Sequence, residues 1–294
     1  MATVNFSRRR ADTFRVETLP RPRPPVVLPA FAPIPELDMV AYERMAREVH
    51  LLLGIDLSRY RPAQVWRRVN GFAAARGIPD ADELVVRVRL DATLRQAFMD
   101  MLTINVSEFF RNPEVWDALA EQYLRPMFRS QASLRIWSAG CSLGFEPFTI
   151  AMLAREIAPF AHVYILATDV DETSLSKARK ATFTEAQMAG VSPARQRRFF
   201  RRTDSSWQVR PEIQALVTFR RQDLVTDPCE GPFDIVVCRN VVIYFTEQAK
   251  TDLYGRLHDC LRPGGILFLG ATEAIPNART FGLLPVGSTF YERP

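Results

Sequence analysis

The feature that most constrains the fold is a repeated pattern of apolar strand, turn and helix that begins at Leu134. Strands that are apolar along their length and alternate with helices are typical of parallel sheets covered on both faces. We therefore predict an α/β fold with a doubly wound, mainly parallel sheet, whose ligand site lies at the carboxyl ends of its strands. The predicted strands are 134–138, 163–169, 217–221, 233–238 and 265–270, and the predicted helices are 147–157, 172–180 and 246–261.

The segment before this pattern is predicted to form an all-helical domain, residues 39–129. Its apolar residues recur at three- and four-residue spacings, as in amphipathic helices that bury one side. The predicted helices run from Met39 to Gly54, from after Ser58 to near Gly77, from 80 to 88 and from 92 to 102.

Residues 1–38 are predicted to be a disordered arm, because seven of the 21 prolines fall there and such a stretch cannot bury enough apolar surface to offset its ordering entropy. No apolar stretch follows the basic run 8–10, so this is not a signal peptide. The α/β domain is predicted to span 130–294. Within it, about 183–218 should hold a helix capped by Ser192 and a small β-hairpin that turns at Asp204.

Composition excludes several classes of protein. No window holds 18 apolar residues, so we expect no membrane insertion. The four cysteines and three histidines are scattered, which disfavours a disulfide framework and a metal site and indicates a reducing, cytoplasmic compartment.

The net charge of +5 predicts an acidic partner. Nucleic acid is disfavoured, because no basic block lies inside the folded part. The second helix carries a basic face, which is either solvated or a docking face for an acidic helix. Its residues are Arg61, Arg67, Arg68 and Arg76.

Two glycines and an acid indicate a nucleoside site. Gly140 and Gly144 bracket the turn after the first strand, where backbone can approach a ligand closely. Asp169 ends the next strand, where a carboxylate can accept both hydroxyls of a ribose. Asp169 could instead cap the following helix, although Asp171 is better placed to do so.

Glu146 opens the helix after the glycine turn, where an acid either complements the helix dipole or opposes a bound cation. A carboxylate there would repel a dinucleotide phosphate, so the pattern favours S-adenosylmethionine over a nicotinamide cofactor. Arg239, Asn240 and Tyr244 follow a buried strand and should reach the ligand edge of the sheet. Tyr244 could alternatively be a core aromatic residue.

Together these segments resemble the CheR family of chemotaxis protein-glutamate methyltransferases, in order and over residues 39–294. The resemblance implies transfer of a methyl group from S-adenosylmethionine to glutamate side chains on the cytoplasmic helical bundle of chemoreceptors. S-adenosylhomocysteine would be the product, with no metal involved. The matching stretches are GIDLS at 54–58, NVSEFFR at 105–111, WSAGCS at 137–142, ATDVD at 167–171, FDIVVCRNVVIYF at 233–245 and PGGILFLG at 263–270.

The resemblance also implies roles for individual residues. Arg111 and Tyr244 would be catalytic, with Arg111 orienting the carboxylate and Tyr244 near the transferred methyl. The residues implied to bind the cofactor are Asn105, Ser107, Arg111, Gly140, Glu146, Asp169, Asp223, Leu224, Arg239 and Asn240.

The chain departs from the family pattern at three positions. Phe145 replaces an acid, Phe148 replaces a tyrosine, and Asp223 stands where asparagine is common. These changes keep a second hypothesis open, a catalytically impaired scaffold that binds S-adenosylmethionine or S-adenosylhomocysteine. A small-molecule methyltransferase is a third and weaker hypothesis. The family's small β-subdomain can bind a receptor's C-terminal peptide as an added strand, and a basic edge here is compatible with that. We expect a monomer.

Overall fold

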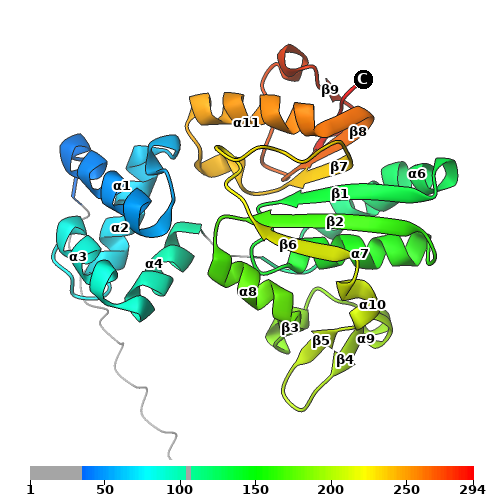
Figure 1. Ribbon diagram of the computed structural model, residues 1–294, viewed down its shortest axis with the longest axis horizontal. Coiled ribbons are helices and arrows are strands. Elements are labelled where there is room, and N and C mark those ends of the chain that lie inside the picture. Colours follow the sequence, from blue (N-terminus) through cyan, green and yellow to red (C-terminus); the bar gives the residue numbers. More distant parts are fainter. Residues whose placement is uncertain (1–34, 104–106) are drawn as a thin grey trace, which may run out of the picture. The chain divides into compact units, whose positions relative to one another are not determined.

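The computed structural model describes residues 35–103 and 107–294 (Figure 1). The predicted arm lies almost wholly outside these residues, and Asn105 is also outside them. Among the described residues, no helix is long and apolar enough to cross a bilayer. The N-terminal helices are α1 (Met39–Leu53), α2 (Pro62–Ala74), α3 (Ala81–Leu90) and α4 (Ala92–Thr103).

The N-terminal helices follow the predicted pattern closely. Asp38 caps α1, and Gly54 ends it in the left-handed conformation at φ +72°, which glycine adopts without strain. The second helix begins later than predicted, at Pro62, because Ser58 lies in a short 3-10 turn, η1 (Leu57–Arg59), in which Asp56 accepts a hydrogen bond from Ser58 N. The four helices enclose their own apolar core.

A seven-stranded sheet confirms the predicted fold class. Its order is β6-β2-β1-β7-β8-β10-β9, with β6 through β8 parallel and β10 antiparallel to both of its neighbours. The chain winds outward from β1 in both directions, so the topological switch point lies between β1 and β7. The strands are β1 (Ser133–Ala139), β2 (His162–Asp169), β6 (Val217–Arg221), β7 (Phe233–Cys238), β8 (Leu261–Leu269), β9 (Leu284–Pro285) and β10 (Phe290–Glu292).

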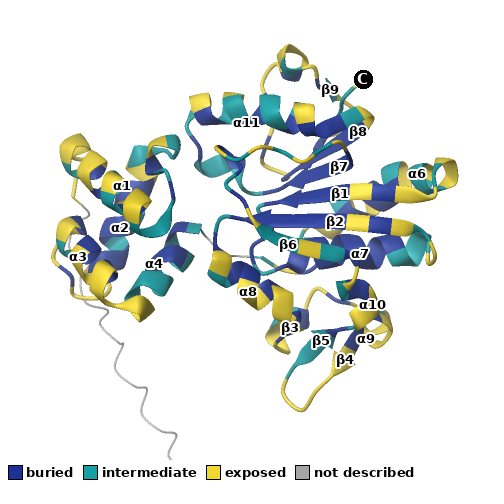
Figure 2. Cartoon of the chain, viewed as in Figure 1, coloured by how far each residue is buried: buried dark blue, intermediate teal, exposed yellow. Residues whose placement is uncertain are grey.

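Alternate residues of each strand enter different cores. Ile136 packs on one face together with α7 (Phe145–Ile157), and Trp137 packs on the other with α11 (Glu247–Cys260). Figure 1 shows these two helices on opposite sides of the sheet. The carboxyl-terminal halves of β1 and β2 are buried throughout, whereas exposed and buried residues alternate at the start of each strand (Figure 2). The sheet is therefore fully packed at the end where the ligand site was predicted.

Three shorter helical segments precede the sheet. They are α5 (Pro113–Ala118), a π-helical turn η2 (Leu119–Leu124) and α6 (Arg125–Ser130). Their buried residues Trp116, Leu119 and Leu124 belong to the core on the α7 side of the sheet. The domain boundary near residue 130 stays a prediction.

The insertion before β6 matches its prediction. Ser192 caps α9 (Pro193–Phe199), and Thr203 N donates to Ser206 O in the hairpin turn. The small sheet has the order β3-β5-β4. The remaining elements of this region are α8 (Glu172–Lys180), β3 (Thr182–Phe183), η3 (Ala186–Met188), β4 (Phe200–Arg202), β5 (Trp207–Val209) and α10 (Pro211–Gln214).

Two predictions about the C-terminal half were wrong. Cys229 and Cys260 form a disulfide, with their Cα atoms 5.9 Å apart, although the cysteine spacing suggested none. The pair joins the loop after β6 to the last residue of α11, a long-range contact that spacing does not reveal. The strand predicted over 265–270 begins instead at Leu261, because the chain passes directly from α11 into β8. The remaining turns are η4 (Val242–Tyr244) and η5 (Ala278–Phe281).

A buried acid organises the amino-terminal end of the central strands. The Asp234 carboxylate accepts hydrogen bonds from Arg135 N at 2.5 Å and Gln131 Nε2 at 3.0 Å. It also pairs with Arg262 at 2.6 Å. These partners compensate the cost of burying its charge.

Candidate active site

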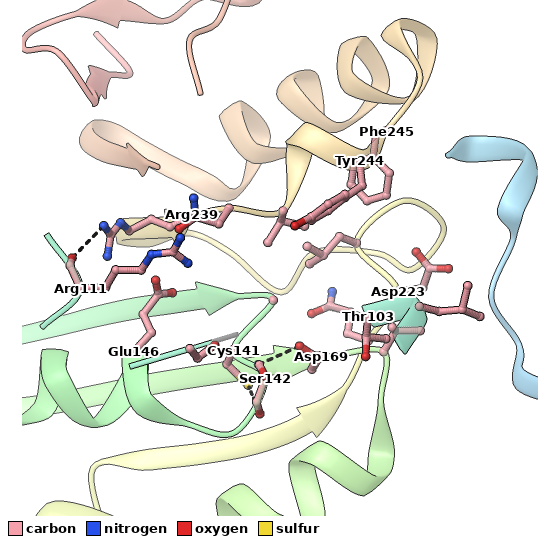
Figure 3. Close-up of a pocket in the computed structure, with 18 of the residues that line it drawn as sticks. Thr103, Arg111, Cys141, Ser142, Glu146, Asp169, Asp223, Arg239, Tyr244 and Phe245 are labelled. Carbon is pink, nitrogen blue, oxygen red and sulfur yellow. Dashed lines mark hydrogen bonds between the residues drawn. The ribbon is translucent and has the colours of Figure 1, made fainter. Parts of the chain in front are cut away.

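A cavity at the carboxyl ends of β1, β2, β6 and β7 gathers the predicted site residues (Figure 3). Ten of the eleven line it, and the eleventh, Asn105, is outside the described residues. The cavity lies where the chain reverses its winding direction, the usual ligand position in such sheets. The ten are Ser107, Arg111, Gly140, Glu146, Asp169, Asp223, Leu224, Arg239, Asn240 and Tyr244.

The glycine turn brings backbone to the cavity. Gly140 has φ +84°, and a Cβ added there would lie 2.6 Å from the Val241 side chain. Any larger residue would therefore be strained and would collide with the segment after β7. Gly144 has φ +87° and precedes α7, so it also needs the freedom of glycine.

Asp169 is held in place at the end of β2. It is buried and accepts hydrogen bonds from Ser142 N at 2.8 Å and Asp171 N at 3.0 Å. Burial raises the pKa of Asp169, which the two N–H donors oppose. Asp171 is the residue that caps α8, because its carboxylate accepts from Thr173 N. The cap alternative for Asp169 is thus excluded, and its carboxylate lines the cavity.

Glu146 lies in the first turn of α7 and accepts a hydrogen bond from Ser138 Oγ at 2.8 Å. Burial raises the pKa of Glu146 to about 7, while nearby Arg239 and the Ser138 hydroxyl lower it. This carboxyl is therefore poised between its two protonation states near neutral pH. A bound cation would favour the ionised form.

Arg239 is a buried cation with an incomplete set of partners. Its Nη2 donates to Arg111 O at 3.1 Å, and its guanidinium lies 4.9 Å from the ring centres of Trp116 and Phe268. Burial lowers the pKa of Arg239. Among the described residues, Arg239 Nε and Gln222 Oε1 are buried without a hydrogen-bond partner, and both residues line the cavity. The cavity thus fits a ligand that supplies polar groups at both positions.

Several residues of the site were not predicted from the sequence. Glu273 Oε2 accepts from Asn240 N at 2.6 Å and Gly270 N at 2.9 Å, joining the ends of β7 and β8. Tyr60, Gln222 and Trp116 line the cavity. Tyr60 belongs to the N-terminal helices, so only the tertiary fold brings it here. Only Gln222 had a signal in the sequence, because it is a polar residue directly after a predicted strand.

The basic face of α2 is only partly solvated. Arg61 pairs with Glu247 at 2.7 Å, and Arg68 donates to the carbonyl groups of Met101 and Leu102. Arg67 is exposed. Arg61 and Arg68 thus already have partners within the chain, whereas both alternatives stay open for the exposed Arg67 and Arg76.

Phe145 and Phe148, two of the departures from the family pattern, lie in the core. Each is only 1% exposed, and neither lines the cavity. Phe145 packs edge-on against Phe109 with 4.9 Å between ring centres and also contacts Phe183. These two substitutions therefore leave the cavity open.

Phe145→Ala should destabilise the fold by about 3–5 kcal/mol, because the lost ring leaves a cavity in the core. Urea denaturation measures the change in the free energy of unfolding. Phe160→Ala is the matched control, since Phe160 is 96% exposed and its loss should change stability little. Equal effects of the two substitutions would contradict the core assignment.

The sheet has a glycine turn after its first strand and an acid after the next, and both line a cavity at the switch point. This arrangement defines a Rossmann-like nucleoside-binding protein. The family models are more specific. The CheR methyltransferase all-alpha domain matches residues 41–103, and the CheR methyltransferase SAM binding domain matches 105–289. The chain therefore belongs to the CheR family of S-adenosylmethionine-dependent chemotaxis methyltransferases.

Curated relatives agree with this assignment. A chemotaxis protein methyltransferase of Listeria monocytogenes is 38% identical over 259 residues, which cover 88% of this chain and 98% of the relative. Chemotaxis protein methyltransferase 1 of Pseudomonas aeruginosa is 36% identical over 236 residues, covering 76% of this chain and 86% of the relative.

Proposed function

We propose that this protein transfers the methyl group of S-adenosylmethionine to glutamate side chains on the cytoplasmic helical bundle of chemoreceptors, forming γ-glutamyl methyl esters. The observation that carries the proposal is the convergence of Asp169, Glu146, Arg111 and Tyr244 on one cavity at the switch point of the sheet. The protein would act in the cytoplasm as a monomer. A receptor's C-terminal peptide is a further proposed partner, bound through the small sheet.

The cavity offers complementary groups along the length of the cofactor. Asp169 would accept from the ribose hydroxyls, and Asp223 with Leu224 would frame the adenine. Glu146 would face the ammonium of the methionine part, and the buried Arg239 Nε would donate to its carboxylate. When bound, the cofactor supplies a methyl group on a positively charged sulfur.

The protein's task in the reaction is placement rather than proton transfer. The glutamate substrate is already ionised at neutral pH, so its oxygen can attack the methyl carbon as the carbon–sulfur bond breaks, and no base is needed. Arg111 would orient the carboxylate, and Tyr244 would line the path of the methyl group. In-line placement of the substrate carboxylate and the methyl group can supply a large part of the rate acceleration.

The scaffold alternative finds less support. It depended on Phe145, Phe148 and Asp223 closing or repelling the site. Phe145 and Phe148 pack in the core instead. Asp223 is partly engaged by its own loop, because its Oδ1 accepts from Val225 N at 2.8 Å.

The proposal is tested by calorimetric titration with S-adenosylmethionine and S-adenosylhomocysteine, followed by transfer of labelled methyl to a chemoreceptor cytoplasmic fragment. A methyl ester releases methanol in mild alkali, whereas an N-methyl group does not. Binding with alkali-labile transfer supports the proposal. Binding without transfer would favour the scaffold. A fragment whose candidate glutamates are replaced by glutamine is the matched control.

Cofactor affinity should rise with pH through neutrality. Only the ionised Glu146 can pair with the ligand ammonium, and its pKa of about 7 makes that form minor at pH 6 and major at pH 8. The affinity for S-adenosylhomocysteine should therefore increase roughly tenfold over this range, as a carboxyl that must deprotonate to bind requires. Titrations at several pH values measure this. Glu146→Gln should flatten the profile, and a wild-type slope in that variant would contradict the assignment.

A further inference from the structure

Residues Arg59–Arg61, here called the clamp segment, pair directly with the chain around Tyr244. Thr246 N donates to Arg59 O at 2.8 Å, and Arg61 N donates to Tyr244 O at 3.0 Å. These two hydrogen bonds form a short antiparallel bridge in which Tyr60 faces Phe245. The connection between α1 and α2 is thereby attached to the segment that follows β7.

Side chains reinforce the bridge on both sides. The Tyr60 ring packs edge-on against Phe245, with 5.0 Å between ring centres. Arg59 pairs with Asp252 at 3.0 Å, and Arg61 pairs with Glu247 at 2.7 Å. Because partly exposed ion pairs contribute little, the geometry depends mainly on the backbone pairing and the aromatic contact.

The clamped segment holds a residue of the proposed reaction centre. Tyr244 is the last residue of the short turn η4. Its N–H donates a long hydrogen bond to Val241 O, at 3.4 Å. Its side chain lines the main cavity and also a second cavity beside α2, and Tyr60 lines both. Figure 3 shows Tyr244 and Phe245 on the same side of the site. A shift of the bridge would therefore move Tyr244.

We propose that the clamp segment positions Tyr244 for methyl transfer, so that Tyr60 and Arg61 are positioning residues supplied by the N-terminal helices. The inference rests on the proposed function. It makes the N-terminal helices part of the reaction geometry in addition to any docking role.

Arg61→Pro breaks the bridge selectively. Arg61 already has φ −65° and ψ 111°, and the preceding Tyr60 is extended at ψ 157°, so proline fits the local backbone. Proline lacks the N–H that reaches Tyr244 O, and its ring would push the two segments apart. Arg61→Ala keeps the N–H and loses only the ion pair with Glu247, which makes it the matched control.

With full-length protein and the chemoreceptor fragment, Arg61→Pro should lower kcat at least about tenfold relative to Arg61→Ala, because displacing a group at the reaction centre by about 1 Å can cost about 100-fold in rate. Its Kd for S-adenosylhomocysteine should stay within a few-fold of that of Arg61→Ala, and its thermal midpoint should fall by only a few degrees, as expected for one lost backbone hydrogen bond. Equal kcat values in the two variants would overturn the clamp. Absence of transfer by the wild type would instead overturn the proposed function and the clamp together.

A second pair of variants covers the case in which Arg61→Pro does not fold. Tyr60→Phe retains the ring that packs on Phe245, and Tyr60→Ala removes it. The alanine variant should have a kcat at least about tenfold below that of the phenylalanine variant, since only it removes the aromatic contact of the clamp. Equal kcat values would overturn the proposal.

Discussion

Arg111→Ala should lower kcat at least about 100-fold and change the affinity for S-adenosylhomocysteine only a few-fold, because we assign its guanidinium to orienting the substrate carboxylate. The substitution leaves the main chain of residue 111 intact. Its carbonyl would still accept from Trp116 Nε1 and from Arg239 Nη2. The neighbouring side of the cavity should thus survive.

Steady-state methylation of a chemoreceptor fragment, combined with calorimetry, separates the two effects. Arg111→Lys is the informative companion, because lysine keeps the charge and loses the planar fork. Partial recovery with lysine would indicate that charge supplies part of the effect. An alanine variant that turns over like the wild type would exclude Arg111 from the reaction centre.

Asp169→Ala should weaken binding of S-adenosylmethionine and S-adenosylhomocysteine by about 100-fold or more. Two hydrogen bonds from ribose hydroxyls to a buried carboxylate are together worth about 3 kcal/mol or more. The loss would be compounded locally, because Ser142 N and Asp171 N would lose their acceptor. The glycine turn should then be less well ordered for the ligand.

Asp171→Ala is the matched control, since it removes an acid two residues away that caps α8. It should cost about 1 kcal/mol of stability, as helix caps do, and leave the affinity of the folded protein nearly unchanged. Calorimetry and urea denaturation of both variants make the comparison. Equal losses of affinity would show that Asp169 acts only through the local fold.

The local features of the fold could be predicted from the sequence because short-range physics determines them. The bounds of α8, β6 and β7 and the cap at Ser192 all match, since apolar periodicity and capping depend on neighbours within a few residues. The ligand edge was also predictable, because parallel strands bring their carboxyl ends together.

Contacts between distant segments could not be predicted in this way. Tyr60 reaches the cavity from the N-terminal helices, and Glu273 holds Asn240 across two strands. The Cys229–Cys260 disulfide also joins segments that lie apart in the sequence. Each depends on how the segments pack, and no spacing rule encodes that. Phe145 was hard to place for a related reason, because a first-turn helical residue can face either the site or the core.

The acid at the other end of the central strands has a consequence for how this chain can change. Asp234 has its partners within the protein, whereas Arg239, which directly follows the same strand, has a buried Nε with no hydrogen-bond partner among the described residues. Substitutions around Asp234 should therefore change mainly the stability of the fold, whereas substitutions around Arg239 should change mainly ligand binding.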